Sequence, residues 1–171
     1  GDYLNEETIL KLARDAGYST AAMGKLGPTL IFDHTERSGA KTIIVDDATG
    51  HRSGIPLSDE VKQRLTAAQV SLEAPRAKVV NREQQAWLTA VATKAVLPMF
   101  KQRGKPFVLV FWSRDPDVSQ HGQRDALERL VPGINGPSSL AAIRNADDTL
   151  ARLLAALKEQ GLDGTTDVIL T

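Results

Sequence analysis

The sequence predicts an α/β fold in which a mostly parallel sheet is flanked by helices. Helix-like and strand-like segments take turns along the chain, and neither an internal repeat nor a low-complexity tract interrupts them. One strand-like run, over 107–112, is apolar at every position, which is typical of a strand covered on both faces in a parallel sheet. With 171 residues, 42% of them hydrophobic, the chain is long enough to bury the core of one domain.

The first half of the chain is expected to hold two helices and two short strands. Asn5 and Ser58 are helix-capping residues, and each precedes a segment with apolar residues at helical spacing. Gly17 ends the first of these segments. The expected elements are a helix over 6–16, strands over 19–23 and 42–45, and a helix over 58–69.

The second half is expected to supply the centre of the sheet. A long helix begins near residue 81, bends at Pro98, which cannot donate a backbone hydrogen bond, and ends at Gly104. The apolar run over 107–112 follows as the central strand. A loop over 113–137, a helix over 138–160 and a strand over 167–171 then complete a βαβ unit, with the last strand parallel to the central one. The helix is expected to pack through Leu140, Ile143, Leu150, Leu154 and Leu157.

Composition excludes several classes of function. Lys plus Arg and Asp plus Glu each number 21, so the net charge is zero, and no basic run forms a platform for nucleic acid. No apolar stretch approaches the length of about 20 residues that spans a bilayer. The chain has no cysteine, so any metal must be bound by His, Asp or Glu.

One candidate metal site follows the expected central strand. Asp117 and His121 are four residues apart, so a single helical turn or a tight loop would bring the carboxylate and the imidazole to one side. Carboxylate and imidazole groups commonly coordinate zinc in proteins. In parallel sheets, small molecules and ions bind at the loops that follow the carboxyl ends of the strands. Two ligands do not complete a zinc site, and an Asp and a His in a polar loop are also common as solvated residues or turn formers. The spacing leaves both interpretations open.

Two other motifs do not carry a site. Gly24-Lys25 lacks the earlier Gly and the following Ser or Thr of a phosphate-binding loop. The run Asp46-Asp47-Ala48-Thr49-Gly50 lacks the regular alternation of an EF-hand loop, and it is interpreted as a turn.

Four segments together resemble a known family. They are the early stretch over 16–25, the strand and motif over 107–121, the helix over 146–157, and the ending Thr166-Asp167-Val168-Ile169-Leu170-Thr171. These segments resemble the alkaline-phosphatase superfamily, specifically its type I phosphodiesterase and nucleotide pyrophosphatase branch. The resemblance is weaker over 33–82, and residues 33–80 are interpreted as a variable insertion, similar to a cap or lid.

The resemblance implies an incomplete alkaline-phosphatase-like domain, in which residues 1–171 are a single α/β fragment of a larger catalytic domain. In the family, an Asp-x-x-x-His motif after a central strand binds one of two catalytic zinc ions, and here it corresponds to Asp117 and His121. The family pattern continues after Thr171 with Ser-Asp-His-Gly, whose Asp and His bind the second metal, and its Thr or Ser nucleophile precedes residue 1. The isolated fragment is therefore expected to be inactive.

The function implied for the parent protein is hydrolysis of phosphodiester or nucleotide pyrophosphate bonds in small-molecule substrates, at a two-zinc site. Other activities of the superfamily stay open, namely phosphomonoesterase, phosphonate hydrolase and sulfatase, because substrate choice depends on the nucleophile segment and on the region over 33–82. A non-catalytic α/β binding module that keeps only the scaffold is a further alternative. Many relatives are exported, so the resemblance favours a periplasmic or extracellular parent protein.

Overall fold

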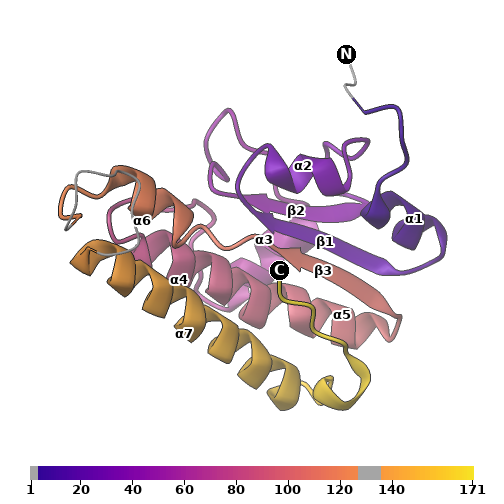
Figure 1. The fold of residues 1–171 in the computed structure, drawn as a ribbon. Coiled ribbons are helices and arrows are strands. Elements are labelled where there is room, and N and C mark those ends of the chain that lie inside the picture. Colours follow the sequence, from indigo (N-terminus) through magenta and orange to yellow (C-terminus); the bar gives the residue numbers. More distant parts are fainter. Residues whose placement is uncertain (1–3, 127–135) are drawn as a thin grey trace.

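Three parallel strands form the centre of the fold. The structure is a computed structural model and describes residues 4–126 and 136–171. The order of the strands across the sheet, shown in Figure 1, is β2 (Thr42–Asp46), β1 (Ser19–Gly24) and β3 (Phe107–Phe111). The register pairs Thr20 of β1 with Thr42 of β2 and with Val108 of β3. The predicted α/β fold with a parallel sheet is therefore confirmed.

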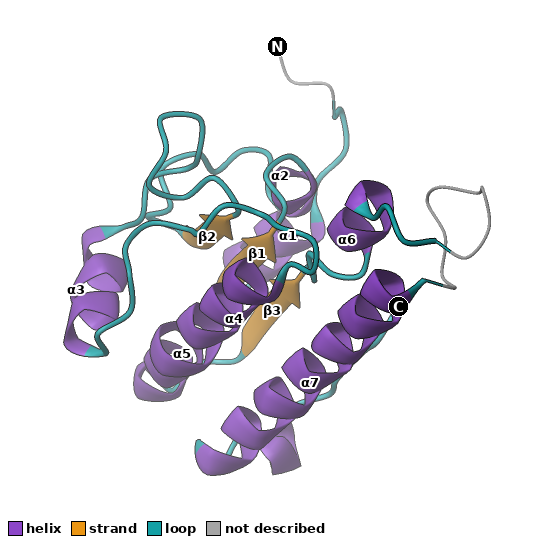
Figure 2. Cartoon of the chain, turned by 90° about the vertical axis from the view of Figure 1, so that its left-hand side faces the viewer, coloured by secondary structure: helices purple, strands orange, loops and turns teal. Residues whose placement is uncertain are grey.

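Helices cover both faces of the sheet (Figure 2). On one face lie α1 (Ile9–Asp15) and α2 (Pro28–Phe32). On the other lie α3 (Asp59–Ala67), α4 (Arg82–Val91), the π-helical turn η1 (Ala92–Val96), α5 (Leu97–Arg103) and α7 (Pro137–Glu159). The short helix α6 (Asp117–Gly122) follows β3, and the 3-10 turn η2 (Asp163–Thr165) follows α7. None of the helices in the described ranges is long and apolar enough to cross a membrane.

The main core lies between the sheet and the helices α3, α4 and α5. Alternate strand residues point to this face, and the three helices and η1 close over them. Its fully buried members include Ala21, Met23, Val45, Leu65, Leu88, Val91, Met99 and Phe100. The interpretation of residues 33–80 as a variable insertion stays a prediction; within that region, β2 belongs to the sheet and α3 packs on this core.

Two helix ends lie where the sequence signals predict them, whereas α1 begins at Ile9, after Thr8, and not after Asn5 as predicted. The Ser58 hydroxyl accepts a hydrogen bond from the Val61 backbone N–H at the start of α3. Gly104 ends α5 in the left-handed region, with a φ of 58°. The long helix is interrupted by η1 directly before α5, where Pro98 has no N–H to donate to the Lys94 carbonyl.

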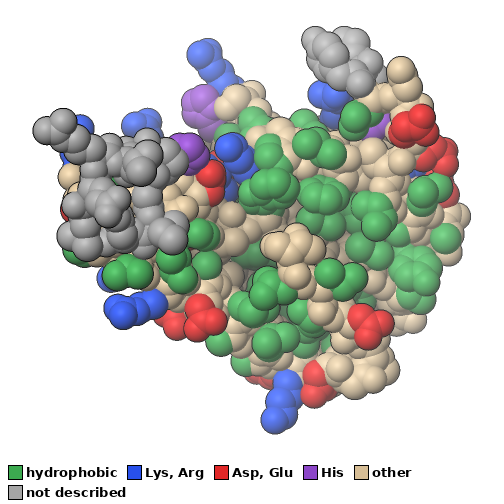
Figure 3. All heavy atoms as spheres, in the orientation of Figure 1, with side chains coloured by type: hydrophobic (Ala, Val, Ile, Leu, Met, Phe, Trp, Pro, Cys, Tyr) green, Lys and Arg blue, Asp and Glu red, His purple; other side chains and the backbone are tan. Residues whose placement is uncertain are grey.

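The strands differ from the prediction in two respects. β1, with mostly small and polar side chains, is the central strand and is buried throughout, whereas the apolar β3 is half-buried and, among the described residues, pairs only with β1. Residues 167–171 do not form the predicted strand, and Ile169 and Leu170 are 85% and 77% exposed. This segment lies on the β3 side of the sheet (Figure 1), but it makes no backbone hydrogen bond to a described residue. Many hydrophobic side chains are exposed on the face of the molecule seen in this view (Figure 3). An apolar, β-branched composition forms a strand only where a neighbouring backbone takes up its hydrogen bonds.

The helix α7 packs through a different face from the predicted one. Three of the predicted packing residues are exposed, namely Leu140, Ile143 and Leu154, while Leu157 is buried as expected. The buried positions of the helix also include Ala142 and Thr149. Small side chains at these positions let α7 lie close against α4, so the exposed leucines turn away from that contact.

Candidate functional site

The carboxyl ends of the three strands meet at one edge of the sheet, beyond which α6 lies (Figure 1). Hydrogen bonding continues past the strands, because the Trp112 N–H donates to the Met23 carbonyl and the Asp47 N–H donates to the Gly24 carbonyl, each at 2.8 Å. Gly24 has a φ of 131°, and a Cβ at this position would overlap the Trp112 carbonyl oxygen. Only glycine therefore lets these strand ends lie so close together. We call this edge, with the loops that follow the strands, the strand-end rim.

Asp115, in the loop between β3 and α6, is a buried anchor of the strand-end rim. Its Oδ2 accepts hydrogen bonds from the Asn81 N–H at 3.2 Å and from the Asn145 amide at 2.6 Å. Its Oδ1 accepts a hydrogen bond from the Ser119 hydroxyl at 2.5 Å. The carboxylate thus ties the start of α4 and the helix α7 to α6. A fully buried carboxylate with this many donors is a structural group that fixes the orientation of α6.

The helix α6 presents Asp117 and His121, the two residues that the sequence singles out. Asp117 begins the helix and His121 follows one turn later, so that Asp117 Oδ1 and His121 Nε2 lie 3.3 Å apart. Their side chains are 47% and 66% exposed, respectively. The loop predicted over 113–137 therefore contains a helix, and its part over 127–135 lies outside the described residues. Asp117 and His121 therefore lie on the same side of α6, as the sequence predicts. Metal binding by the two residues stays a prediction.

Two cationic side chains lie beside the Asp117 carboxylate. Lys25 Nζ, from the turn after β1, and Arg114 Nη1, from the loop after β3, are each 3.9 Å from Asp117 Oδ2. Arg114 Nε also lies 2.8 Å from Asp47 Oδ2, in the turn after β2. Each of the three strands is thus followed by a charged residue that takes part in the strand-end rim.

The Arg114 guanidinium is held in place mainly by charge. Only 8% of its side chain is exposed, and Nε and Nη1 make no aligned hydrogen bond to a described residue, although Nε is at ion-pair distance from Asp47. Its backbone N–H donates to Gln85 Oε1 at 2.9 Å, which anchors the residue on α4. A buried and fixed positive charge of this kind favours an anion at the adjoining surface.

Asp46 holds the turn that presents Asp47. Asp46 is fully buried, and its carboxylate accepts hydrogen bonds from the Ala48 N–H at 2.7 Å and the Ile55 N–H at 2.8 Å. Burial raises the pKa of Asp46 above its ordinary value of 3.8, although the two N–H donors oppose this shift. Asp46 therefore shapes the turn from inside, and the Asp47 side chain is left to pair with Arg114.

The donors at the strand-end rim suit a divalent cation in part. A carboxylate oxygen and an imidazole nitrogen are zinc ligands, and those of Asp117 and His121 approach closely enough to bind one ion. Within residues 4–126 and 136–171, no group of three or more His, Cys, Asp or Glu side chains is placed to hold a metal. The two residues therefore fit as part of a ligand set that further groups would complete.

Three charged residues of the strand-end rim were missed by the sequence analysis, namely Lys25, Asp47 and Arg114. The stretch around Lys25 fails the pattern of a phosphate-binding loop, and the turn at Asp47 fails that of an EF-hand, so neither motif marks them. Position is the signal that could have found all three. Each follows a strand of a parallel sheet within two or three residues, and carboxyl ends of such strands meet at one edge.

Comparison with models of known protein families gives a match over nearly the whole chain. The family model described as type I phosphodiesterase / nucleotide pyrophosphatase matches residues 2–171, a range that includes the whole sheet and the strand-end rim. Comparisons with curated proteins and with solved structures give no match.

Proposed function

The chain belongs to the type I phosphodiesterase / nucleotide pyrophosphatase family, and we propose that it contributes part of a zinc-dependent active site that hydrolyses phosphodiester or nucleotide pyrophosphate bonds. The observation that carries this proposal is the pair Asp117 and His121, 3.3 Å apart and open to solvent. The pair follows a strand of a parallel sheet, at the edge where such sheets bind their ligands.

In this proposal Asp117 and His121 hold one of two zinc ions, and other groups of the protein complete the ligand sets. Two bound divalent ions would neutralise phosphoryl oxygens and lower the pKa of an attacking hydroxyl group. Asp117 and His121 would then serve as ligands, and neither would be a nucleophile. The buried Asp115 would keep both on one side, because it fixes the helix that carries them.

Lys25 and Arg114 would give the same rim an affinity for anions. Phosphate esters and nucleotides carry negative charge on their non-bridging oxygens, and a partly buried cation attracts such charge more strongly than a solvated one. Arg114 is held by Asp47 and by its backbone bond to Gln85, so its charge would stay in place while substrate binds. This supports a small phosphate ester or nucleotide as the substrate.

Hydrolysis by the full-length protein tests the proposal. We expect turnover of a phosphodiester or a nucleotide pyrophosphate, loss of turnover on chelation, and recovery with zinc. Asp117→Ala and His121→Ala should each lower kcat/KM by at least about 100-fold. Asp59→Ala, which removes an exposed carboxylate on α3, should leave kcat/KM unchanged and serves as the control. Wild-type turnover in both site variants would contradict the proposal.

A wider set of substrates separates the alternatives. A phosphate monoester, a phosphonate and a sulfate ester would be measured beside the diester under the same conditions. If the protein hydrolyses one of these three faster than the diester, the assignment of the metal site would stand and the assigned substrate class would change. Zinc-independent folding with no turnover of any substrate would favour a non-catalytic α/β binding module.

A further inference from the structure

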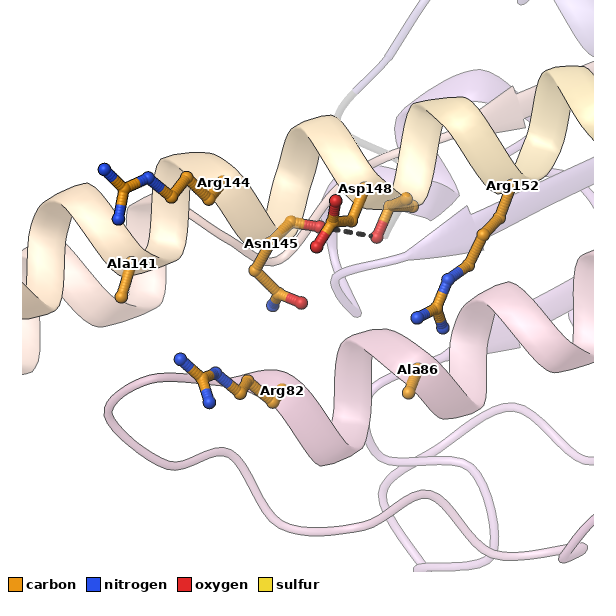
Figure 4. Close-up of a pocket in the computed structure, with 8 residues that line it drawn as sticks. Arg82, Ala86, Ala141, Arg144, Asn145, Asp148 and Arg152 are labelled. Atoms are coloured by element: carbon orange, nitrogen blue, oxygen red, sulfur yellow. Dashed lines mark hydrogen bonds between the residues drawn. The ribbon is translucent and has the colours of Figure 1, made fainter.

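A groove lies between α4 and α7, and its lining includes neither Asp117 nor His121. Its volume is about 420 Å³, which is within the range of pockets that bind small ligands. The polar part of its lining, drawn in Figure 4, consists of Arg82 on α4 and of Arg144, Asn145, Asp148, Thr149 and Arg152 on α7.

The groove carries an excess of positive charge. Three guanidinium groups and one carboxylate line it, so its formal charge is three minus one, or plus two. Arg144 and Arg152 each lie one helical turn from Asp148, yet neither is within ion-pair distance of that carboxylate. In the described ranges, Arg82, Arg144 and Arg152 enter no ion pair, whereas Arg14, Arg103 and Arg114 pair with Asp side chains or a Glu side chain. The surplus charge is thus available to a ligand.

Positive groups on both helices line the gap. Figure 4 shows the Arg152 side chain reaching from α7 toward α4 and the Asn145 amide between the two helices, whereas the Arg82 side chain extends along the start of α4 and the Arg144 side chain along α7. The Asn145 Nδ2 donates to the buried Asp115 at 2.6 Å, which fixes the amide. A ligand in the groove would therefore meet guanidinium groups on two sides and an immobilised polar group between them.

We propose that the groove is a second anion site, which binds a phosphate-bearing small molecule with at least two negative charges. The planar guanidinium group donates paired hydrogen bonds that match phosphate oxygens. One carboxylate offers two oxygens, too few for three guanidinium groups, whereas pyrophosphate has enough acceptors for all of them. The site uses none of the charged residues of the strand-end rim, so it goes beyond the proposed hydrolytic function.

Occupancy of the groove would reach the strand-end rim through one hydrogen bond. Asn145 lines the groove and bonds to Asp115, and Asp115 fixes the helix that carries Asp117. Binding should therefore shift the NMR resonances of the Asn145 side-chain amide and of the Asp115 N–H. This readout reports on the groove without depending on catalysis.

Calorimetric titration of the full chain with pyrophosphate tests the proposal. At low salt we expect binding, weakened at least about tenfold when Arg144→Gln and Arg152→Gln are combined, since each change removes a charge-assisted contact. Asp148→Asn should tighten binding, because it removes the one carboxylate of the groove. Arg76→Gln, an exposed arginine outside the groove, should leave the affinity unchanged.

Lys25→Gln, which removes a cation of the strand-end rim, distinguishes the groove from the rim. Unchanged affinity for pyrophosphate in this variant supports the groove, while loss of binding would assign the ligand to the rim and overturn the proposal. Wild-type affinity in the double arginine variant, or no pyrophosphate binding by the unmodified protein, would overturn it as well. Failure of the proposed hydrolysis would leave this result unaffected, because the titration needs no turnover.

Discussion

Asp115 and Asp117 lie two residues apart in the chain, yet they have opposite surroundings. Asp115 is fully buried and accepts hydrogen bonds from α6, α7 and the start of α4, whereas Asp117 is 47% exposed, with His121 at 3.3 Å and Lys25 and Arg114 at 3.9 Å. One carboxylate is thus used up in holding the fold, and the other is open to a ligand. The comparison teaches that the buried acid positions the exposed one, so changes at the two sites should affect different properties.

The largest effect on stability is expected from Asp115→Ala. This change removes the acceptor of the Ser119 hydroxyl and of the Asn145 amide and one of the two acceptors of the Asn81 N–H, so the free energy of unfolding should fall by about 3 kcal/mol. Urea denaturation measures the loss. Asp115→Asn keeps the volume and one acceptor oxygen and should lose less. Equal stability of Asp115→Ala and the wild type would break the comparison.

Gly24→Ala should be the next most destabilising change. The backbone at Gly24 has a φ of 131°, and the added methyl group would overlap the Trp112 carbonyl oxygen beneath the strand-end rim. We expect a loss of about 2 kcal/mol in the free energy of unfolding. Gly17→Ala is the matched control, because Gly17 also has a positive φ, of 89°, but has open space around it. Similar losses in both variants would show that backbone conformation, and not the close approach of the strands, accounts for the effect.

Glu36 extends the comparison to pH. Burial would raise the pKa of this carboxyl, but donation from Ser38 and from the Lys41 and Gly39 N–H groups outweighs it, so the pKa lies below the ordinary value of 4.5. The carboxylate therefore adds stability above about pH 4.5, and this contribution is lost as the pH falls through the lowered pKa of the folded state. Glu36→Gln should lower the free energy of unfolding at neutral pH by about 1 kcal/mol.

Urea denaturation over a series of pH values checks this prediction. The difference between the wild type and Glu36→Gln should shrink on acidification. Asp46 provides the contrast, because burial raises its pKa, so its charged form disfavours the folded state increasingly as the pH rises through that pKa. A difference at Glu36 that stays constant down to about pH 3 would contradict the assigned shift.

Asp117→Asn should have the smallest effect on stability. The side chain is half-exposed, and the cations Lys25 and Arg114 are each 3.9 Å from its carboxylate, so the free energy of unfolding should change by less than about 0.5 kcal/mol. Thermal and urea denaturation both measure it. A loss as large as that of Asp115→Ala would mean that Asp117 is a structural residue too.

The sequence was informative about local elements and less so about their neighbours. The periodicity of α7 identifies which side chains share a face, but it does not say which face meets α4, and the small residues Ala142 and Thr149 fill that contact. The apolar β3 was expected at the centre, yet the centre is β1, whose side chains are mostly small or polar and which is buried throughout. Strand order and helix contacts depend on packing between distant segments, which composition does not encode.

The same limit applies to the strand-end rim. Asp117 and His121 could be paired from the sequence because one helical turn joins them. Lys25, Asp47 and Arg114 come together only through the order of three strands, so no local motif links them. The proximity of Asp117 and His121 follows from their spacing in the sequence alone. The charged residues around them can be identified only when the order of the strands in the sheet is known.

Zinc stoichiometry of the full-length protein tests the central claim most directly. We expect two equivalents of zinc in the wild type and in Asp59→Ala, and the loss of one equivalent in Asp117→Ala and in His121→Ala, each measured by elemental analysis after dialysis against limiting zinc. Equal zinc content and affinity in all four proteins would contradict the assignment of Asp117 and His121 as metal ligands.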